Sequence, residues 1–204
     1  MAVLVTDPVL ASRLKSEREA SGADRFDEVW EGVYMMTPMP NDEHQRIVML
    51  LGSILQEVIG WPGLGEVRPS VNVSDREKDW QDNYRVPDLA VFLRGGVAKN
   101  CGQFWCGGPD LAVEIISPDD RTREKLTFYG NIGVRELLLV NRDPWALELY
   151  RSAGGNLRMA EQASLDQGAI AASQIVPVDF RLESGVARPT IIVSLRDRSR
   201  MWTI

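Results

Sequence analysis

The sequence is poor in the residues that bind zinc. It has 204 residues but one histidine and two cysteines. Because a zinc site needs about four nitrogen, sulfur or carboxylate ligands, we expect no zinc centre here. Cys101 and Cys106, in the loop sequence CGQFWC, are interpreted as two reduced thiols. His44 falls on the apolar face of a predicted helix, which favours a structural, hydrogen-bonded role over that of a general base.

Long apolar runs and a recognisable leader are also missing. No run approaches the roughly 18 residues that a membrane-spanning helix needs. The N-terminal sequence MAVLVTDPVLASRLK is interrupted by Asp7 and Pro8 and lacks the basic start of a signal peptide. We therefore expect a cytoplasmic protein that makes no contact with a membrane.

Positive charge is scarce as well. The chain has 23 lysines and arginines against 29 aspartates and glutamates, a formal net charge of -6. This balance argues against a broad cationic surface that would bind nucleic acid by releasing counterions. A local basic surface, or a metal ion that supplies positive charge locally, remains compatible with it.

The sequence does contain enough apolar residues for a core. Hydrophobic residues make up 44% and charged residues 25%, as in ordinary globular proteins. This length suits a single domain over residues 1–204. We expect its core at about residues 26–150, with an N-terminal helix and a C-terminal segment of strands and turns appended.

Periodicity predicts a mixed sheet with helices on its faces, an α/β or α+β domain. Helices are expected at residues 9–20, 41–60 and 121–131, the last capped by Asp119 or Asp120. Strands are expected at residues 28–37 (a hairpin turning at Glu31-Gly32), 66–74, 86–93, 110–117, 134–140 and 146–151. The tail from residue 168 alternates short apolar runs with turns, and we expect strands there that can end in a helix.

Two acids interrupt apolar stretches, Asp88 in YRVPDLAVFL and Glu114 in PDLAVEIISP. Side chains alternate along a strand, so Glu114 lies on the same face as Ala112 and Ile116. A buried carboxylate must be protonated, paired with a cation or bound to a metal. For either acid alone, pairing with an arginine such as Arg85 or Arg121 is the ordinary explanation.

Two such acids on separate strands favour a shared site. Magnesium takes oxygen ligands from one or two carboxylates and keeps several waters. Lys125 lies one turn into the helix that follows the Glu114 strand, so its side chain can point back towards that acid. Beside a metal, a lysine can orient a water or neutralise charge that develops on a phosphate; otherwise a helix lysine is simply solvated.

Five motifs, taken in their order along the chain, resemble those of a known family. EVWEG, MMTPMPNDEH, VPDLAVF, GPDLAVEIISP and EKLTFYGNIGVRELLLVNRDPW together resemble the restriction endonuclease-like family of small bacterial proteins, a branch of the PD-(D/E)xK nuclease superfamily. The resemblance runs from about residue 28 to residue 145. It implies a central mixed sheet flanked by helices, in which acids bind Mg²⁺ or Mn²⁺ for hydrolysis of DNA phosphodiesters.

The resemblance also implies site residues. Asp88 and Glu114 match the family's two metal-binding acids, and Glu28 matches the glutamate of an early Glu-x-x-Asp-Gly pattern, with Glu31 in place of the aspartate. The lysine that the superfamily has two residues after the second acid is Ile116 here. Lys125, on the next helix, matches the lysine that this family places there.

These observations lead to a main hypothesis and two alternatives. The main hypothesis is a DNA endonuclease that uses Mg²⁺ or Mn²⁺, with DNA as its partner and a homodimer compatible with two cuts in a duplex. The first alternative is a nuclease-fold module that binds nucleic acid or protein and cuts nothing. The second is a metal-free hydrolase in which Asp88 and Glu114 form an acid/base pair.

Overall fold

A central six-stranded sheet organises the computed structural model, which describes residues 3–117 and 121–204. Its strand order is β13-β12-β11-β10-β7-β4. The strands are β4 (Gly65–Pro69), β7 (Leu89–Leu93), β10 (Leu111–Ile115), β11 (Glu136–Arg142), β12 (Trp145–Ala153) and β13 (Asn156–Ala163). Since β10 and β11 are parallel while the other neighbours are antiparallel, the predicted mixed sheet is confirmed.

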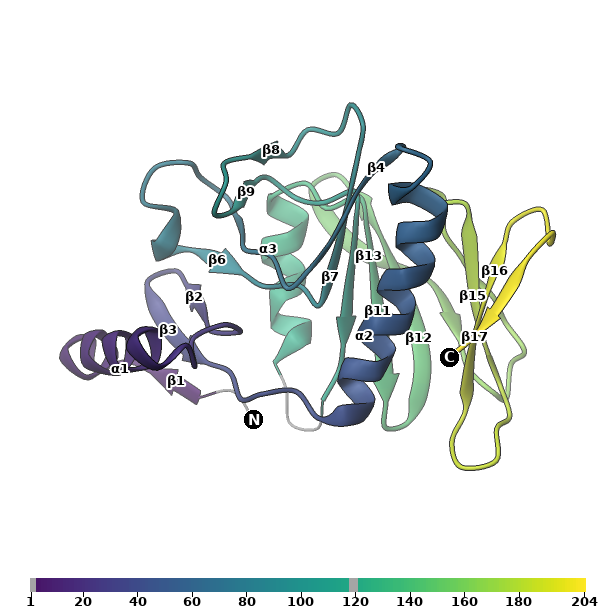
Figure 1. The fold of residues 1–204 in the computed structure, drawn as a ribbon, viewed down its shortest axis with the longest axis horizontal. Coiled ribbons are helices and arrows are strands. Elements are labelled where there is room, and N and C mark those ends of the chain that lie inside the picture. The colour runs from purple at the N-terminus through teal and green to yellow at the C-terminus, as the bar shows by residue number, and fades with distance from the viewer. Residues whose placement is uncertain (1–2, 118–120) are drawn as a thin grey trace.

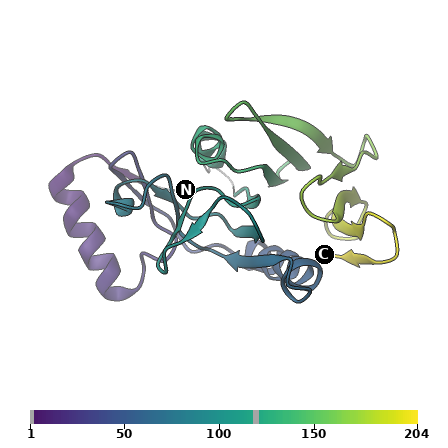
Figure 2. The ribbon, with the colours of Figure 1, turned by 90° about the horizontal axis from the view of Figure 1, so that it is seen from above.

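One helix covers each face of this sheet. Helix α2 (Asp42–Leu55) continues into a π-helical turn (Gln56–Gly60) on one face. Helix α3 (Leu126–Asn131), preceded by the 3-10 helix Thr122–Lys125, lies on the other face, as Figures 1 and 2 show. The Asn41 side chain caps α2 by accepting a hydrogen bond from the His44 amide at 3.0 Å, as predicted.

Side chains along β10 alternate between the sheet face covered by α2 and the face covered by α3. Leu111, Val113 and Ile115 belong to the aliphatic core that includes Ile47 of α2. The intervening Ala112 belongs to the second core, which includes Phe128 and Tyr129 of α3. Glu114 therefore points to the α3 face, into an otherwise apolar layer.

A second sheet has the strand order β1-β3-β2-β6-β5-β9-β8. Its strands are β1 (Val3–Val5), β2 (Glu28–Trp30), β3 (Val33–Met36), β5 (Val73–Ser74), β6 (Tyr84–Arg85), β8 (Lys99–Asn100) and β9 (Trp105–Cys106). The predicted hairpin of β2 and β3 is confirmed, with positive φ at Glu31 and Gly32. The predicted single strand over residues 66–74 is wrong, because the chain bends at Ser70 (φ 47°) and divides between the two sheets.

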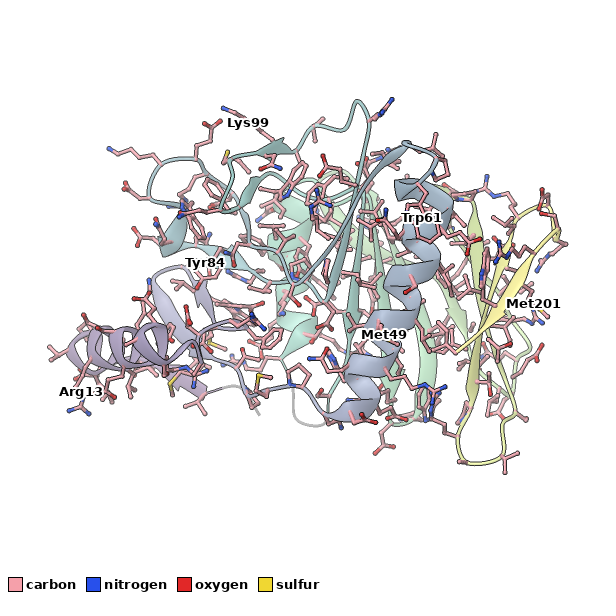
Figure 3. The ribbon with its side chains drawn as sticks, viewed as in Figure 1. Arg13, Met49, Trp61, Tyr84, Lys99 and Met201 are labelled. Carbon is pink, nitrogen blue, oxygen red and sulfur yellow. The ribbon has the colours of Figure 1, made fainter. Side chains whose placement is uncertain are left out.

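Helix α1 (Pro8–Ser21) confirms the first predicted helix. Asp7 caps its start, and Gly22 ends it in the left-handed conformation at φ 69°. The helix lies beside β1 at one end of the molecule (Figure 1). Figure 3 places Arg13 of α1 at that end and Met201 of β17 (Met201–Thr203) at the other.

The C-terminal segment forms a four-stranded sheet with β17 at its edge. The other strands are β14 (Ala171–Ala172), β15 (Val178–Glu183) and β16 (Thr190–Leu195). The helical end that the sequence suggested is wrong, since β17 pairs antiparallel with β16. Phe180 and Val193 of this sheet join the aliphatic core under α2.

Two predicted boundaries shift near the acids. The strand expected at residues 86–93 begins at Leu89, so Asp88 immediately precedes β7 instead of lying within it. The helix expected at residues 121–131 begins with a 3-10 turn, and its proposed caps, Asp119 and Asp120, lie outside the described residues. Among the helices described here, none is both long and apolar enough to cross a membrane.

Candidate active site

A cavity of about 280 Å³ lies where the N-terminus of α2, the β2–β3 hairpin and the ends of β7 and β10 meet. All four site residues predicted from the sequence line it. They are Glu28, Asp88, Glu114 and Lys125. The cavity thus brings together residues separated by up to 97 positions in the chain.

Sheet register places Asp88 beside Glu114. Val113 of β10 pairs with Leu89 of β7, so the next residues along the two antiparallel strands are Glu114 and Asp88. The Ile115 amide donates a hydrogen bond to Asp88 Oδ2 at 2.7 Å. His44 Nε2 lies 3.1 Å from the same oxygen. Asp88 Oδ2 is thus contacted from β10 and from α2.

Glu114 is buried, and its partners come from the helical segment after β10. Lys125 Nζ lies 3.0 Å from Glu114 Oε1, and the Tyr129 hydroxyl donates to the same oxygen at 2.5 Å. The expectation that Lys125 points back to Glu114 is confirmed.

The arginine pairing considered from the sequence is wrong for both acids. Arg85 donates hydrogen bonds to the Val29 and Tyr84 carbonyls and the Asn83 side chain, and Arg121 pairs with Glu124. The cation that compensates Glu114 is therefore a lysine from the next helical segment.

Glu28 reaches this cluster from the second sheet. Lys125 Nζ lies 2.8 Å from Glu28 Oε1, which also accepts a hydrogen bond from the Val86 amide at 2.8 Å. The Trp30 indole donates to the other carboxylate oxygen at 2.6 Å. Lys125 consequently bridges two acids from different sheets. Glu31, by contrast, is exposed and pairs with Arg85 outside the cavity lining.

Burial and neighbouring acids dominate the electrostatics. Burial raises the pKa of Glu114 to about 8; the Lys125 ammonium opposes the shift, and the carboxylates of Asp88 and Glu28 add to it. Burial would lower the pKa of Lys125, but its two carboxylate partners outweigh it and the pKa lies above its usual value. Burial also raises the pKa of Tyr129, keeping this phenol a hydrogen-bond donor.

Asp88 and Glu114 present carboxylate oxygens, which are the ligand type that a hard divalent cation takes. Within the described ranges no group of three or more histidine, cysteine, aspartate or glutamate side chains is arranged to hold a metal. Hydrogen bonds from the described residues reach Asp88 at Oδ2 and Glu114 at Oε1, leaving Oδ1 and Oε2 without one. Two free carboxylate oxygens suit Mg²⁺ or Mn²⁺, which keep water as their other ligands.

Two residues of the site were missed from the sequence. Tyr129 follows Lys125 by four positions, so the helical spacing could have identified it as a second partner of Glu114. No local pattern indicates the contact of His44 with Asp88, because it arises when α2 packs across the ends of the strands. The expected hydrogen-bonded structural role of His44 stays a prediction: its Nε2 lies 3.1 Å from Asp88 Oδ2, and its Nδ1 is buried without a partner among the described residues.

The tryptophans of the loops and the two cysteines lie outside the cavity lining, whereas Trp30 of β2 is part of it. Trp80 stacks on Phe104 and Trp105 stacks on Phe92, so both pack locally. Trp61 is exposed after α2 (Figure 3). Cys101 and Cys106 are free thiols.

Comparisons with known proteins connect this arrangement to a family. A family model described as "Uma2: Putative restriction endonuclease" matches residues 17–185. No curated protein matches the chain. Among solved structures, the chain is similar to "a putative nuclease belonging to DUF820" from Anabaena variabilis ATCC 29413. Identity is 20% and the TM-score 0.56, over 72% of this chain and 80% of that one, which supports a shared fold.

Proposed function

Because the chain belongs to the Uma2 family, described as "Putative restriction endonuclease", we propose that the acidic cavity is the active site of a metal-dependent DNA endonuclease. The observation that carries the proposal is the convergence of Asp88, Glu114 and Lys125 on one cavity. Two carboxylates and an adjacent ammonium are the side-chain types that metal-assisted phosphodiester hydrolysis uses.

Each residue has a distinct proposed role. Asp88 and Glu114 would hold the divalent ion, and Tyr129 fixes Glu114 by donating a hydrogen bond to its Oε1. When bound, Mg²⁺ or Mn²⁺ supplies Lewis-acid stabilisation of the phosphate and a water of lowered pKa. Lys125 orients that water or stabilises the charge that develops on the phosphate.

Glu28 supports the lysine instead of binding metal directly. Both of its oxygens already accept hydrogen bonds, from the Val86 amide and the Trp30 indole. Its ion pair with Lys125 keeps the ammonium beside Glu114. Glu28 thus completes the acidic cluster and holds Lys125 in place.

One observation favours the alternative of a non-catalytic binding module. Lys125 already lies within 3.0 Å of Glu114 and 2.8 Å of Glu28, so protein charge alone compensates much of the buried acid. A nuclease fold that has lost its metal would be stabilised in the same way. A direct activity assay separates the two functions.

The assay incubates the purified protein with plasmid, linear duplex and single-stranded DNA, with Mg²⁺, with Mn²⁺ or with EDTA. Asp88→Asn and Glu114→Gln are the matched variants. We expect cleavage that needs metal and is lost in both variants. Cleavage in EDTA would support the acid/base pair, and cleavage that persists in both variants would point to another site or a contaminant.

DNA binding without cleavage would favour the binding module. The homodimer is tested in parallel by sedimentation velocity with and without duplex DNA. We expect a dimer on DNA, because cutting both strands of a duplex uses two copies of the site.

A further inference from the structure

His44 is a buried polar side chain that the proposed chemistry does not use. It is 5% exposed, and its ring is held through one nitrogen. Nε2 lies 3.1 Å from Asp88 Oδ2, close enough for a hydrogen bond. Nδ1 is buried and has no hydrogen-bond partner among the described residues. The polar contact of the imidazole is therefore directed at a proposed metal ligand.

Packing alone does not account for a histidine at this position. Buried polar groups in folded proteins are almost always hydrogen-bonded, and one left unpaired is unfavourable. Ile47, Val48 and Leu51, on the same face of α2, are all buried and aliphatic. A leucine at position 44 would continue that apolar face without an unpaired nitrogen. Compared with a leucine, the histidine adds the polar contact with Asp88.

We propose that His44 is a positioning residue that orients the Asp88 carboxylate for metal binding. This inference rests on the proposed function. The Ile115 amide and His44 Nε2 approach the same oxygen, Oδ2, from β10 and from α2. Together they hold the carboxylate so that Oδ1 is the oxygen available to the ion.

The position of Asp88 explains why it needs a second support. Asp88 immediately precedes β7, just beyond the last residue pair of β7 and β10, whereas Glu114 lies within β10 and pairs in register with Leu139 of β11. It is also the most exposed of the acids in the cavity, at 15% of its side chain. Without His44, the Ile115 amide is the one hydrogen-bond donor that the described residues offer to this carboxylate. Residues that hold metal ligands in this way typically contribute about 10- to 100-fold to metal affinity.

The test measures Mn²⁺ affinity by titration calorimetry on the full-length protein. His44→Leu removes the donor and keeps the apolar packing. His44→Gln places an amide nitrogen close to the position of Nε2 and so restores a donor to Asp88. Ile47→Val is the control for a small packing change in α2, because Ile47 belongs to the aliphatic core and is not part of the cavity lining.

We expect His44→Leu to bind Mn²⁺ about 10- to 100-fold more weakly, with a melting temperature equal to or above that of the wild type. His44→Gln should recover most of the affinity, and Ile47→Val should bind like the wild type while melting slightly lower. That pattern separates positioning from a merely structural role, which would lower stability without a selective loss of metal binding.

Two results would overturn the inference. In the first, wild-type protein binds Mn²⁺ and His44→Leu binds it equally well. In the second, His44→Gln is no better than His44→Leu, or, where His44→Leu does not fold, a folded His44→Gln binds Mn²⁺ at least 10-fold more weakly than Ile47→Val. Failure of the wild type itself to bind Mn²⁺ would instead remove the proposed function, and the inference with it.

Discussion

Two buried glutamates lie on one row of the central sheet, and their surroundings differ. Glu114 of β10 pairs in register with Leu139 of β11, which pairs with Glu148 of β12. Both glutamates therefore point to the face covered by α3. Both also receive a cation from the same 3-10 helix, Lys125 for Glu114 and Arg123 for Glu148.

The difference lies in how completely each carboxylate is paired. Arg123 donates to both oxygens of Glu148, at 2.5 and 2.7 Å, and the Tyr150 hydroxyl adds a third hydrogen bond. These hydrogen bonds, above all those from Arg123, lower the pKa of Glu148. Glu114 has one oxygen without a hydrogen bond from the described residues, and burial raises its pKa.

Incomplete pairing, more than burial, distinguishes the proposed site from a structural ion pair. A bidentate arginine fills the coordination positions of a carboxylate and leaves none for a metal. A lysine is a single compact charge and can share a carboxylate with another cation. The same helix can thus supply a structural pair and a site on one sheet face.

The largest expected effect concerns catalysis. Glu114→Gln should reduce DNA cleavage on the order of 1000-fold, because losing a metal ligand costs more than the about 10- to 100-fold typical of residues behind the ligands. Glu148→Gln should leave the rate within about twofold, since its carboxylate is fully used by Arg123. Initial rates on plasmid DNA measure both. Equal losses of rate in the two variants would mean that Glu114 and Glu148 do not differ in function.

Lys125 and Arg123, the cations paired with these two glutamates, should differ in the same way in their effect on the cleavage rate. Lys125→Met should lower the cleavage rate by about 100-fold, the loss typical when a group that stabilises transition-state charge is removed. Arg123→Met, from the same helical turn, should change the rate little. Single-turnover rates at saturating Mg²⁺ provide the comparison. A larger loss for Arg123→Met would reassign the site towards Glu148.

Competition between protons and metal should also distinguish Glu114 from Glu148. With a pKa of about 8, Glu114 is protonated at pH 6 and must lose its proton to bind metal. Apparent Mn²⁺ affinity should therefore rise by up to about tenfold per pH unit below pH 8 and level off above it. Glu148→Gln should keep this slope. A flat profile in the wild type would show that Glu114 does not bind the ion as a carboxylate.

The smallest expected effect is on the free energy of unfolding. Here Glu148→Gln should cause the greater loss, whereas Glu114→Gln causes the greater loss of activity. Glu148→Gln should lower the free energy of unfolding by about 1–2 kcal/mol at pH 7, limited because Arg123 is half-exposed. Because the folded pKa of Glu148 is lowered, the advantage of the wild type is present above the unfolded pKa and is lost as the pH falls through the folded value.

Glu114→Gln should change the free energy of unfolding by less than about 1 kcal/mol at pH 4, where glutamine replaces an acid that is mostly protonated in both the folded and the unfolded state. Because the folded pKa of Glu114 is raised, the wild type loses stability relative to this variant as the pH rises above the unfolded pKa. Urea unfolding of the two variants at pH 4, 6 and 7 checks both expectations. If Glu114→Gln destabilises the protein more than Glu148→Gln at pH 6, then Glu114, and not Glu148, is the residue with the structural role.

Periodic sequence signals accounted for much of the fold. The apolar spacing and the Asn41 cap predicted α2, and near-continuous apolar runs predicted β7, β10 and β11. Strands of two residues, such as β5 and β6, carry no periodic signal, so the second sheet was not predicted beyond its β2–β3 hairpin. The division of residues 66–74 depends on a bend at Ser70 that only tertiary pairing sets.

The acids of the site could be predicted, but their partners mostly could not. Asp88 and Glu114 were conspicuous because each interrupts an apolar run, and Lys125 followed from helical geometry and family resemblance. Glu148 interrupts an apolar run in the same way, in ALELYR. What separates it from Glu114 is Arg123, which lies 25 residues earlier and reaches it only through packing of the 3-10 helix.

The central claim is that the under-paired member of the row binds a divalent ion. Its most direct test is calorimetric titration of Mn²⁺ at pH 8 into wild-type protein, Glu114→Gln and Glu148→Gln. The account predicts one site of equal affinity in the wild type and Glu148→Gln, and no measurable binding in Glu114→Gln. Undiminished binding in Glu114→Gln would contradict it.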